Sequence, residues 1–109
     1  MESQERLQQL LQMLASEPED PFLRYAIAIE YRKTDKTKAL QMLEELATSN
    51  PEYPATYYIL AEMYQEVGRM AEALATYQKG IAICQQVQDR HALSELQRAY
   101  QQLQEELEE

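Results

Sequence analysis

The chain has 109 residues, of which 45% are hydrophobic and 27% charged, and its formal net charge at pH 7 is -9. This length suits one small domain, and its 10 Lys and Arg residues do not form the extended basic stripe by which proteins bind nucleic acids. Negative charge also opposes binding to anionic membranes, no apolar run approaches a membrane span, and the Gln-rich amino terminus has no secretory signal pattern. Cys84 is the only cysteine, which excludes an internal disulfide and is consistent with a reducing compartment. We therefore expect a cytoplasmic protein with neither a nucleic-acid nor a membrane partner.

Apolar residues recur at helical spacing along the whole chain, and no segment combines strict alternation with β-branched residues. The pattern predicts an all-α protein with about six helices. Their expected ranges are 2–16, 21–33, 36–49, 54–67, 70–86 and 89–107.

One stretch of the sequence occurs twice. Pro18-Glu19-Asp20-Pro21 opens one copy and Pro51-Glu52-Tyr53-Pro54 opens the other, so the two openings are 33 residues apart. Tyr31 and Tyr64 have the same separation. Self-similarity at this period predicts an array of helical repeats, and such arrays present a concave surface to a partner.

The second copy has aromatic and small residues at the spacing of a known motif. They are Tyr57, Leu60, Ala61, Tyr64, Gly68, Ala73, Tyr77 and Gly80. On these residues the chain resembles the tetratricopeptide repeat family, which implies a right-handed α-α superhelix of helix pairs. Gln85 stands where the family has a closing Pro, so we expect the second helix of this repeat to be longer than usual. In the first copy Arg24 replaces the first aromatic residue, and the turn at 34–37 is one residue shorter and lacks Gly.

The resemblance implies a single domain over residues 1–109. We expect a leading half repeat at 1–20, repeat 1 at 21–53, repeat 2 at 54–87 and a trailing capping helix at 88–109. Two full repeats are few for a stable array, because a repeat can bury its apolar face only against neighbouring repeats.

Both terminal helices have apolar faces that invite two interpretations. In the last helix Leu93, Leu96, Tyr100, Leu103 and Leu107 follow the spacing of a heptad seam. The helix is either a solvating cap packed on the preceding helix, or a segment that pairs with a second chain. The first helix has a wide apolar face as well. A homodimer would use one or both faces, and the candidate residues for self-association are Leu7, Leu11, Tyr100, Leu103 and Leu107.

No constellation of catalytic residues is present in the sequence. His91 near a helix start is typical of a solvated or capping residue, and Cys84 has the apolar spacing of a core residue. Metal ligation needs several convergent Cys, His or carboxylate groups, and two glycines cannot form a Gly-rich phosphate loop. We expect no enzymatic activity, no metal and no cofactor.

The resemblance also implies where a partner would bind, because the inner surface of the family's superhelix is built mainly from the first helix of each repeat. The implied groove residues are Phe22, Tyr25, Ile29, Arg32, Lys33, Tyr58, Glu62, Gln65 and Glu66, with Ala55, Ala92 and Leu96 as further contributors. Family members that hold an acidic chaperone tail use a clamp of Lys, Asn and Arg. Here Tyr25, Ile29 and Glu62 occupy several of those positions, which argues against that ligand.

Two features of this surface have alternative readings. Phe22 and Tyr25 would contact a different partner protein, contact a second copy of the chain, or pack on the leading helix as core residues. The basic residues Arg32, Lys33, Lys36 and Lys38 form either a solvated turn or an anchor for an acidic group.

The sequence therefore predicts a non-catalytic protein–protein interaction module, an adaptor or scaffold, that binds a peptide or partner helix in its concave groove. The alternative is a homo-oligomeric structural unit that self-associates through its terminal helices.

Overall fold

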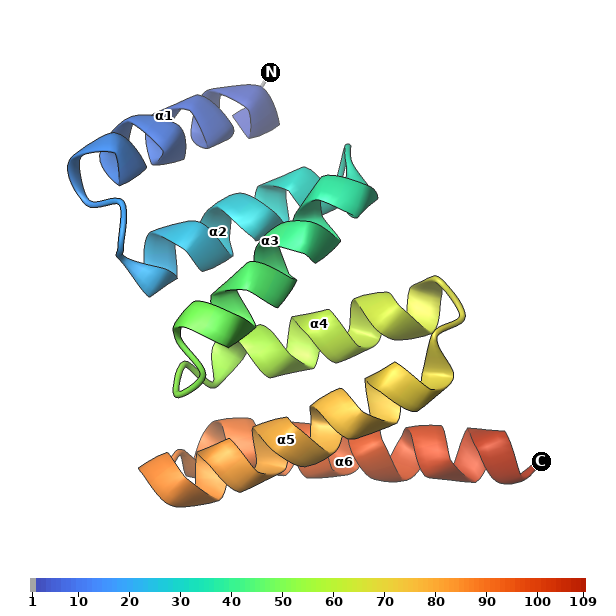
Figure 1. Ribbon diagram of the computed structural model, residues 1–109. Helices are drawn as coiled ribbons and strands as arrows, with labels where there is room; N and C mark the ends of the chain where they lie inside the picture. The colour runs from blue at the N-terminus through green and yellow to red at the C-terminus, as the bar shows by residue number, and fades with distance from the viewer. Residues whose placement is uncertain (1) are drawn as a thin grey trace. The chain divides into compact units, whose positions relative to one another are not determined.

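The computed structural model describes residues 2–109 and consists of six α-helices, with no strand in this range (Figure 1). The helices are α1 (Glu2–Ser16), α2 (Pro21–Arg32), α3 (Lys36–Ser49), α4 (Ala55–Glu66), α5 (Met70–Val87) and α6 (Arg90–Glu108). Each end lies within one residue of the predicted end, which confirms the predicted all-α helical repeat. Residue 1, the first of the predicted half repeat, lies outside the described residues.

Contacts between Cα atoms divide the chain into two compact units, the first ending at Asn50 and the second beginning at Pro51. The division falls close to the predicted boundary between the two repeats at residues 53 and 54.

The first unit contains α1, α2 and α3, with α2 packed against both of its neighbours. The side chain of Asp20 caps α2 by accepting hydrogen bonds from the backbone N–H groups of Phe22 and Leu23, at 2.8 and 3.2 Å. Pro21 occupies the first turn, where its missing N–H is not needed. The core shared by α1 and α2 consists of Leu10, Leu23, Ala26 and Ile27, with Leu7, Leu14, Tyr31 and Met42 packed against it.

An ion pair between the exposed Arg6 of α1 and the buried Glu30 of α2 joins the two helices in this unit. Glu30 is only 5% exposed, and Arg6 Nε lies 2.9 Å from its Oε1 atom. Lys33 Nζ lies 3.1 Å from the other carboxylate oxygen, Oε2. A carboxylate is buried at little net cost only when it is paired and hydrogen-bonded. The sequence pattern did not predict this pair.

The second unit contains α4, α5 and α6. Helix α5 packs against both α4 and α6, whereas α4 and α6 touch each other only slightly. Ala61 of α4 and Ala73 of α5 are fully buried, as expected from small residues that let the two helices of a repeat approach closely. A Cβ atom at Gly80 would lie 2.6 Å from Tyr57 Cβ and 3.1 Å from Leu96 Cδ1. The absence of a side chain at residue 80 therefore sets the distance of α5 from both neighbours.

Two residues with positive φ end the helices of the second repeat. Gly68 has φ +80° in the α4–α5 turn, where the resemblance placed it. Helix α5 has 18 residues against 14 in α3, which confirms the longer helix expected from Gln85. It ends at Val87, and the capping residue Gln88 that follows has a φ of 61°, in the left-handed region. Asp89 then caps α6 by accepting a hydrogen bond from Ala92 N–H at 3.0 Å.

The apolar seam of α6 is largely used inside the chain. Leu96 and Leu103 are buried, Leu93 and Tyr100 are half-buried, and Leu107 is exposed. Tyr100 also accepts a hydrogen bond from Gln78 of α5 at 2.6 Å. At 2% exposure Leu103 has no surface to offer a second chain, because its place in the seam faces the protein interior.

Candidate functional site

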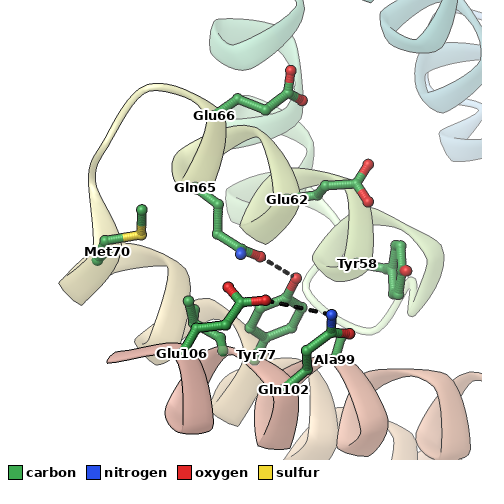
Figure 2. Close-up of a pocket in the computed structure, with 10 residues that line it drawn as sticks. Tyr58, Glu62, Gln65, Glu66, Met70, Tyr77, Ala99, Gln102 and Glu106 are labelled. Atoms are coloured by element: carbon green, nitrogen blue, oxygen red, sulfur yellow. Dashed lines mark hydrogen bonds between the residues drawn. The ribbon is translucent and has the colours of Figure 1, made fainter. Parts of the chain in front are cut away.

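A cleft of about 380 Å³ opens in the second unit between α4 and α6, above α5 (Figure 2). We call it the α4–α6 cleft, and its volume lies within the range of about 300–1,000 Å³ typical of ligand pockets. It exists because both wall helices rest on α5 and scarcely touch each other. Its lining residues are Tyr58, Glu62, Gln65, Glu66, Met70, Tyr77, Ala99, Gln102, Leu103 and Glu106.

Tyr77 of α5 is fixed between the two walls of the cleft. Its ring is 2% exposed, and its hydroxyl donates a hydrogen bond to Gln65 Oε1 at 2.6 Å (Figure 2). The ring of Tyr58 meets it in an edge-to-face arrangement, with centroids 6.5 Å apart and an interplanar angle of 73°. Burial, helped by Tyr58, Glu62 and Glu106, raises the pKa of Tyr77 to about 12. The hydroxyl is therefore a neutral donor at physiological pH, and it holds Gln65 in place.

The polar groups of the walls are strongly biased in charge. Glu62 and Glu66 come from α4, and Glu106 comes from the last turn of α6, where the helix dipole adds partial negative charge. Glu106 accepts a hydrogen bond from Gln102 at 3.4 Å (Figure 2). None of the ten described lining residues is Lys, Arg or His. The cleft thus combines three carboxylates with tyrosine rings.

Of the five groove residues predicted in repeat 2, Tyr58, Glu62, Gln65 and Glu66 line this cleft, whereas Ala55 does not. Tyr58, Glu62 and Gln65 are half-buried, and Glu66 is exposed. Sequence reasoning missed the opposite wall, formed by Ala99, Gln102, Leu103 and Glu106 of α6. Ala92 and Leu96, which were expected to contribute from this helix, do not line the cleft. Leu96 instead packs inside, within reach of residue 80.

The five groove residues predicted in repeat 1 lie in the first unit. Phe22 is 58% exposed, whereas Tyr25, Ile29 and Arg32 are half-buried. Lys33 is exposed and pairs with the buried Glu30. Of this set, Phe22 therefore presents the largest accessible apolar surface.

The basic turn between α2 and α3 has local structural contacts. Lys38 Nζ lies 4.6 Å from the centroid of the Tyr31 ring, and Asp35 caps α3 by accepting from Lys38 N–H at 3.1 Å. Together with the Lys33–Glu30 pair, these contacts order the turn.

The remaining candidates for chemistry have no reactive surroundings. His91 is highly exposed, with Nε2 3.1 Å from Glu95 Oε1. Cys84 is buried, and burial raises the pKa of its thiol, which lowers the fraction of reactive thiolate. Within residues 2–109 no group of three or more His, Cys, Asp or Glu side chains is placed to hold a metal. No described helix is long and apolar enough to cross a membrane.

The paired helices, the small residues between them and the open cleft define a helical-repeat protein. No protein-family model matches the chain, and neither does any curated protein. Solved structures do match. The solution structure of a tetratricopeptide repeat domain protein from Salinibacter ruber is 41% identical, covers 79% of this chain and 88% of its own, and has a TM-score of 0.76. A crystal structure of a tetratricopeptide repeat domain protein from the same organism is 40% identical. This match covers 79% of this chain and 97% of the other, with a TM-score of 0.76.

A third match, the solution structure of a protein from Bordetella parapertussis, is 26% identical with a TM-score of 0.77, covering 92% of this chain and 88% of its own. At the identity and coverage of the two Salinibacter ruber structures, the chain belongs to the tetratricopeptide repeat family. Domains of this family are in general non-catalytic scaffolds that bind other proteins, so the chain is a protein-interaction module of that general class.

Proposed function

We propose that this protein is a cytoplasmic adaptor that binds a peptide or helix of a protein partner in the α4–α6 cleft. The observation that carries the proposal is the convergence of Tyr58, Glu62, Gln65 and Glu66 with a second wall from α6 on one open cleft. Tyrosine is enriched among residues that dominate binding energy, since its ring supplies contact area at low entropic cost.

The cleft is also organised before any partner arrives. Tyr77 is held by its hydrogen bond to Gln65 and by the ring of Tyr58. Both walls rest on the tightly packed α5. A preformed site reduces the free energy spent on ordering side chains during association, which favours binding of a short segment.

The repeat organisation belongs to the same proposal. Residues 21–53 and 54–87 act as the two full repeats, residues 1–20 as a leading half repeat and residues 88–109 as the trailing helix. For the first unit we propose a separate contact surface formed by Phe22, Tyr25, Ile29, Arg32 and Lys33, with the exposed Phe22 ring as its main anchor.

Site-specific photo-crosslinking in the native host tests the cleft. A photoreactive residue is placed at Gln102, which lines the cleft, and in a control protein at Gln97, an exposed position of α6 that does not. We expect a discrete partner adduct from position 102 only, and loss of that adduct with Tyr58→Ala. Equal adducts from both positions, or an adduct at 102 unaffected by Tyr58→Ala in a folded protein, would reject the cleft as the binding surface.

A second candidate is a homodimer formed through the terminal helices, and exposed apolar side chains favour it. On α1, Leu11 is 40% and Met13 54% exposed. Leu107 near the end of α6 is exposed as well, whereas Leu7 is partly packed in the core. Sedimentation equilibrium should show a dimer that Leu11→Glu disrupts and that Gln12→Glu, at the exposed neighbouring position, does not. A monomeric mass throughout the micromolar range would reject this candidate.

A further inference from the structure

We propose that the α4–α6 cleft binds the main chain of an extended protein segment, through the side-chain amides of Gln65 on one wall and Gln102 on the other. The inference rests on the proposed function and deepens it, because it selects an extended segment over a helix as the occupant. It is carried by the hydrogen bonds that orient the two amides from within the chain.

The α4 wall presents a hydrogen-bond donor. Gln65 Oε1 accepts from the hydroxyl of the buried Tyr77 at 2.6 Å, and the raised pKa of Tyr77 keeps this hydroxyl protonated at physiological pH. The bond occupies the oxygen of the Gln65 amide, whereas the Nε2 atom has no partner among the described residues. A half-buried side chain held in this way leaves an oriented N–H donor on the wall of the cleft.

The α6 wall presents an acceptor. Gln102 Nε2 donates to Glu106 Oε1 at 3.4 Å. An ionised carboxylate only accepts hydrogen bonds, so this contact turns the nitrogen of the Gln102 amide towards Glu106. Gln102 Oε1 has no partner within residues 2–109. Figure 2 shows the side chains of Gln65 and Gln102 directed from their two helices towards the Tyr77 hydroxyl between them.

A donor on one wall and an acceptor on the other match a peptide bond. In a trans peptide the C=O and N–H groups point in opposite directions, so one peptide unit between the walls can accept from Gln65 Nε2 and donate to Gln102 Oε1. An extended segment offers these groups freely, whereas an α-helix pairs them internally. A helix in the cleft would therefore displace water from both amides without replacing its hydrogen bonds, which weakens association.

The exposed face of α6 supplies a matched control for this arrangement. Gln101 Nε2 donates to Glu105 Oε1 at 3.2 Å, the same contact one position earlier, but neither residue lines the cleft. The difference between residues 101 and 102 therefore isolates the position of the amide in the cleft from its role on the helix.

Backbone ester substitution tests the inference. A peptide is first selected with the full chain from a phage-displayed random library, and loss of its binding with Tyr58→Ala places it in the cleft. Each amide N–H of this peptide is then replaced in turn by an ester oxygen, which removes the donor and leaves every side chain unchanged. Fluorescence anisotropy measures binding to the parent, to Gln102→Met and to the control Gln101→Met, and circular dichroism verifies that each variant is folded.

We expect one ester position to weaken binding to the parent and to the control at least about fivefold, as for one lost hydrogen bond, and to have little effect on Gln102→Met. Gln65→Glu retains an acceptor for Tyr77 but removes the donor, so it should weaken binding of the unmodified peptide to a similar degree. Ester effects of equal size in the parent and in Gln102→Met would overturn the inference, and so would unchanged binding by Gln65→Glu.

The same measurements separate this inference from the proposed function. A peptide that requires Tyr58 but is insensitive to every ester, or is helical when bound by transferred nuclear Overhauser effects, would overturn main-chain recognition while supporting the cleft as a binding surface. A selection in which no peptide depends on Tyr58 would overturn both proposals.

Discussion

Replacing Gly80 with Ala tests the close packing of α5 against its neighbours. The added Cβ would lie 2.6 Å from Tyr57 Cβ and 3.1 Å from Leu96 Cδ1, whereas carbon atoms in contact are normally about 3.5–4.0 Å apart. Helices α4 and α5 must therefore separate by about 1 Å to restore ordinary contact. Tyr57 Cβ is bonded directly to the α4 backbone, so no side-chain rotation can relieve the clash.

Two effects of opposite sign decide the outcome. Ala is favoured over Gly in a helix interior by about 1 kcal/mol, whereas overpacking a core contact costs about 1–3 kcal/mol. The closest contact is with a rigid atom, so we expect the cost to fall in the upper part of that range. The free energy of unfolding should then drop by about 1–2 kcal/mol.

Urea unfolding followed by far-ultraviolet circular dichroism measures this change. Ala75→Gly is the matched control, because residue 75 is exposed on the same helix and reports the helix-propensity difference alone. If Gly80→Ala stabilises the protein by as much as Ala75→Gly destabilises it, then the helices separate without cost and the packing argument is wrong.

Four further predictions follow from other residues. Gln88→Gly should stabilise the protein by about 1 kcal/mol, because Gln88 has φ 61° and glycine adopts this conformation without strain; a loss of stability on chemical unfolding would contradict this. The Thr56 hydroxyl is fully buried and has no hydrogen-bond partner within residues 2–109, so Thr56→Val should raise the unfolding midpoint by the equivalent of about 1 kcal/mol, and a lower midpoint would show that the hydroxyl is satisfied. The pKa of Tyr77 is raised from 10.0 to about 12, so its contribution to the free energy of unfolding is complete below pH 10 and is lost as pH rises towards about 12. Tyr77→Phe should make this alkaline decline in the free energy of unfolding shallower, and an unchanged slope against pH would refute the prediction. Arg6→Met should cost about 1 kcal/mol in the parent but not in a Glu30→Gln background, and equal losses in both would mean that the ion pair contributes no stability.

The helices could be predicted from sequence because their apolar faces and boundary residues agree. Pro21 and Pro54 stand at or beside helix starts, and the tetratricopeptide motif fixes which residues of α4 and α5 meet. Gln88 could not be predicted as the left-handed terminus of α5, since a non-glycine residue rarely has positive φ. Glu30 was equally hidden, because its burial depends on Arg6 of another helix.

Only one wall of the candidate site could be predicted. The α4 wall follows from repeat positions, whereas α6 departs from the repeat motif and its apolar seam contains five similar residues. The structure buries two of them, Leu96 and Leu103, seven residues apart. This choice of register turns Gln102 and Glu106 towards α4, and it depends on the shape of α5 rather than on α6 alone.

In the second unit, the residues that pack the helices together are not the residues that give the cleft its charge, and this separation affects how such a protein can change during evolution. Ala73 and Gly80, which hold α5 against its neighbours, are fully enclosed and tolerate little variation. The side chains that give the cleft its charge stand on the walls, where substitutions usually change stability by no more than about 0.5 kcal/mol. Substitutions at Glu62, Gln102 or Glu106 can therefore change the charge of the cleft while the packing of the helices beneath it stays the same.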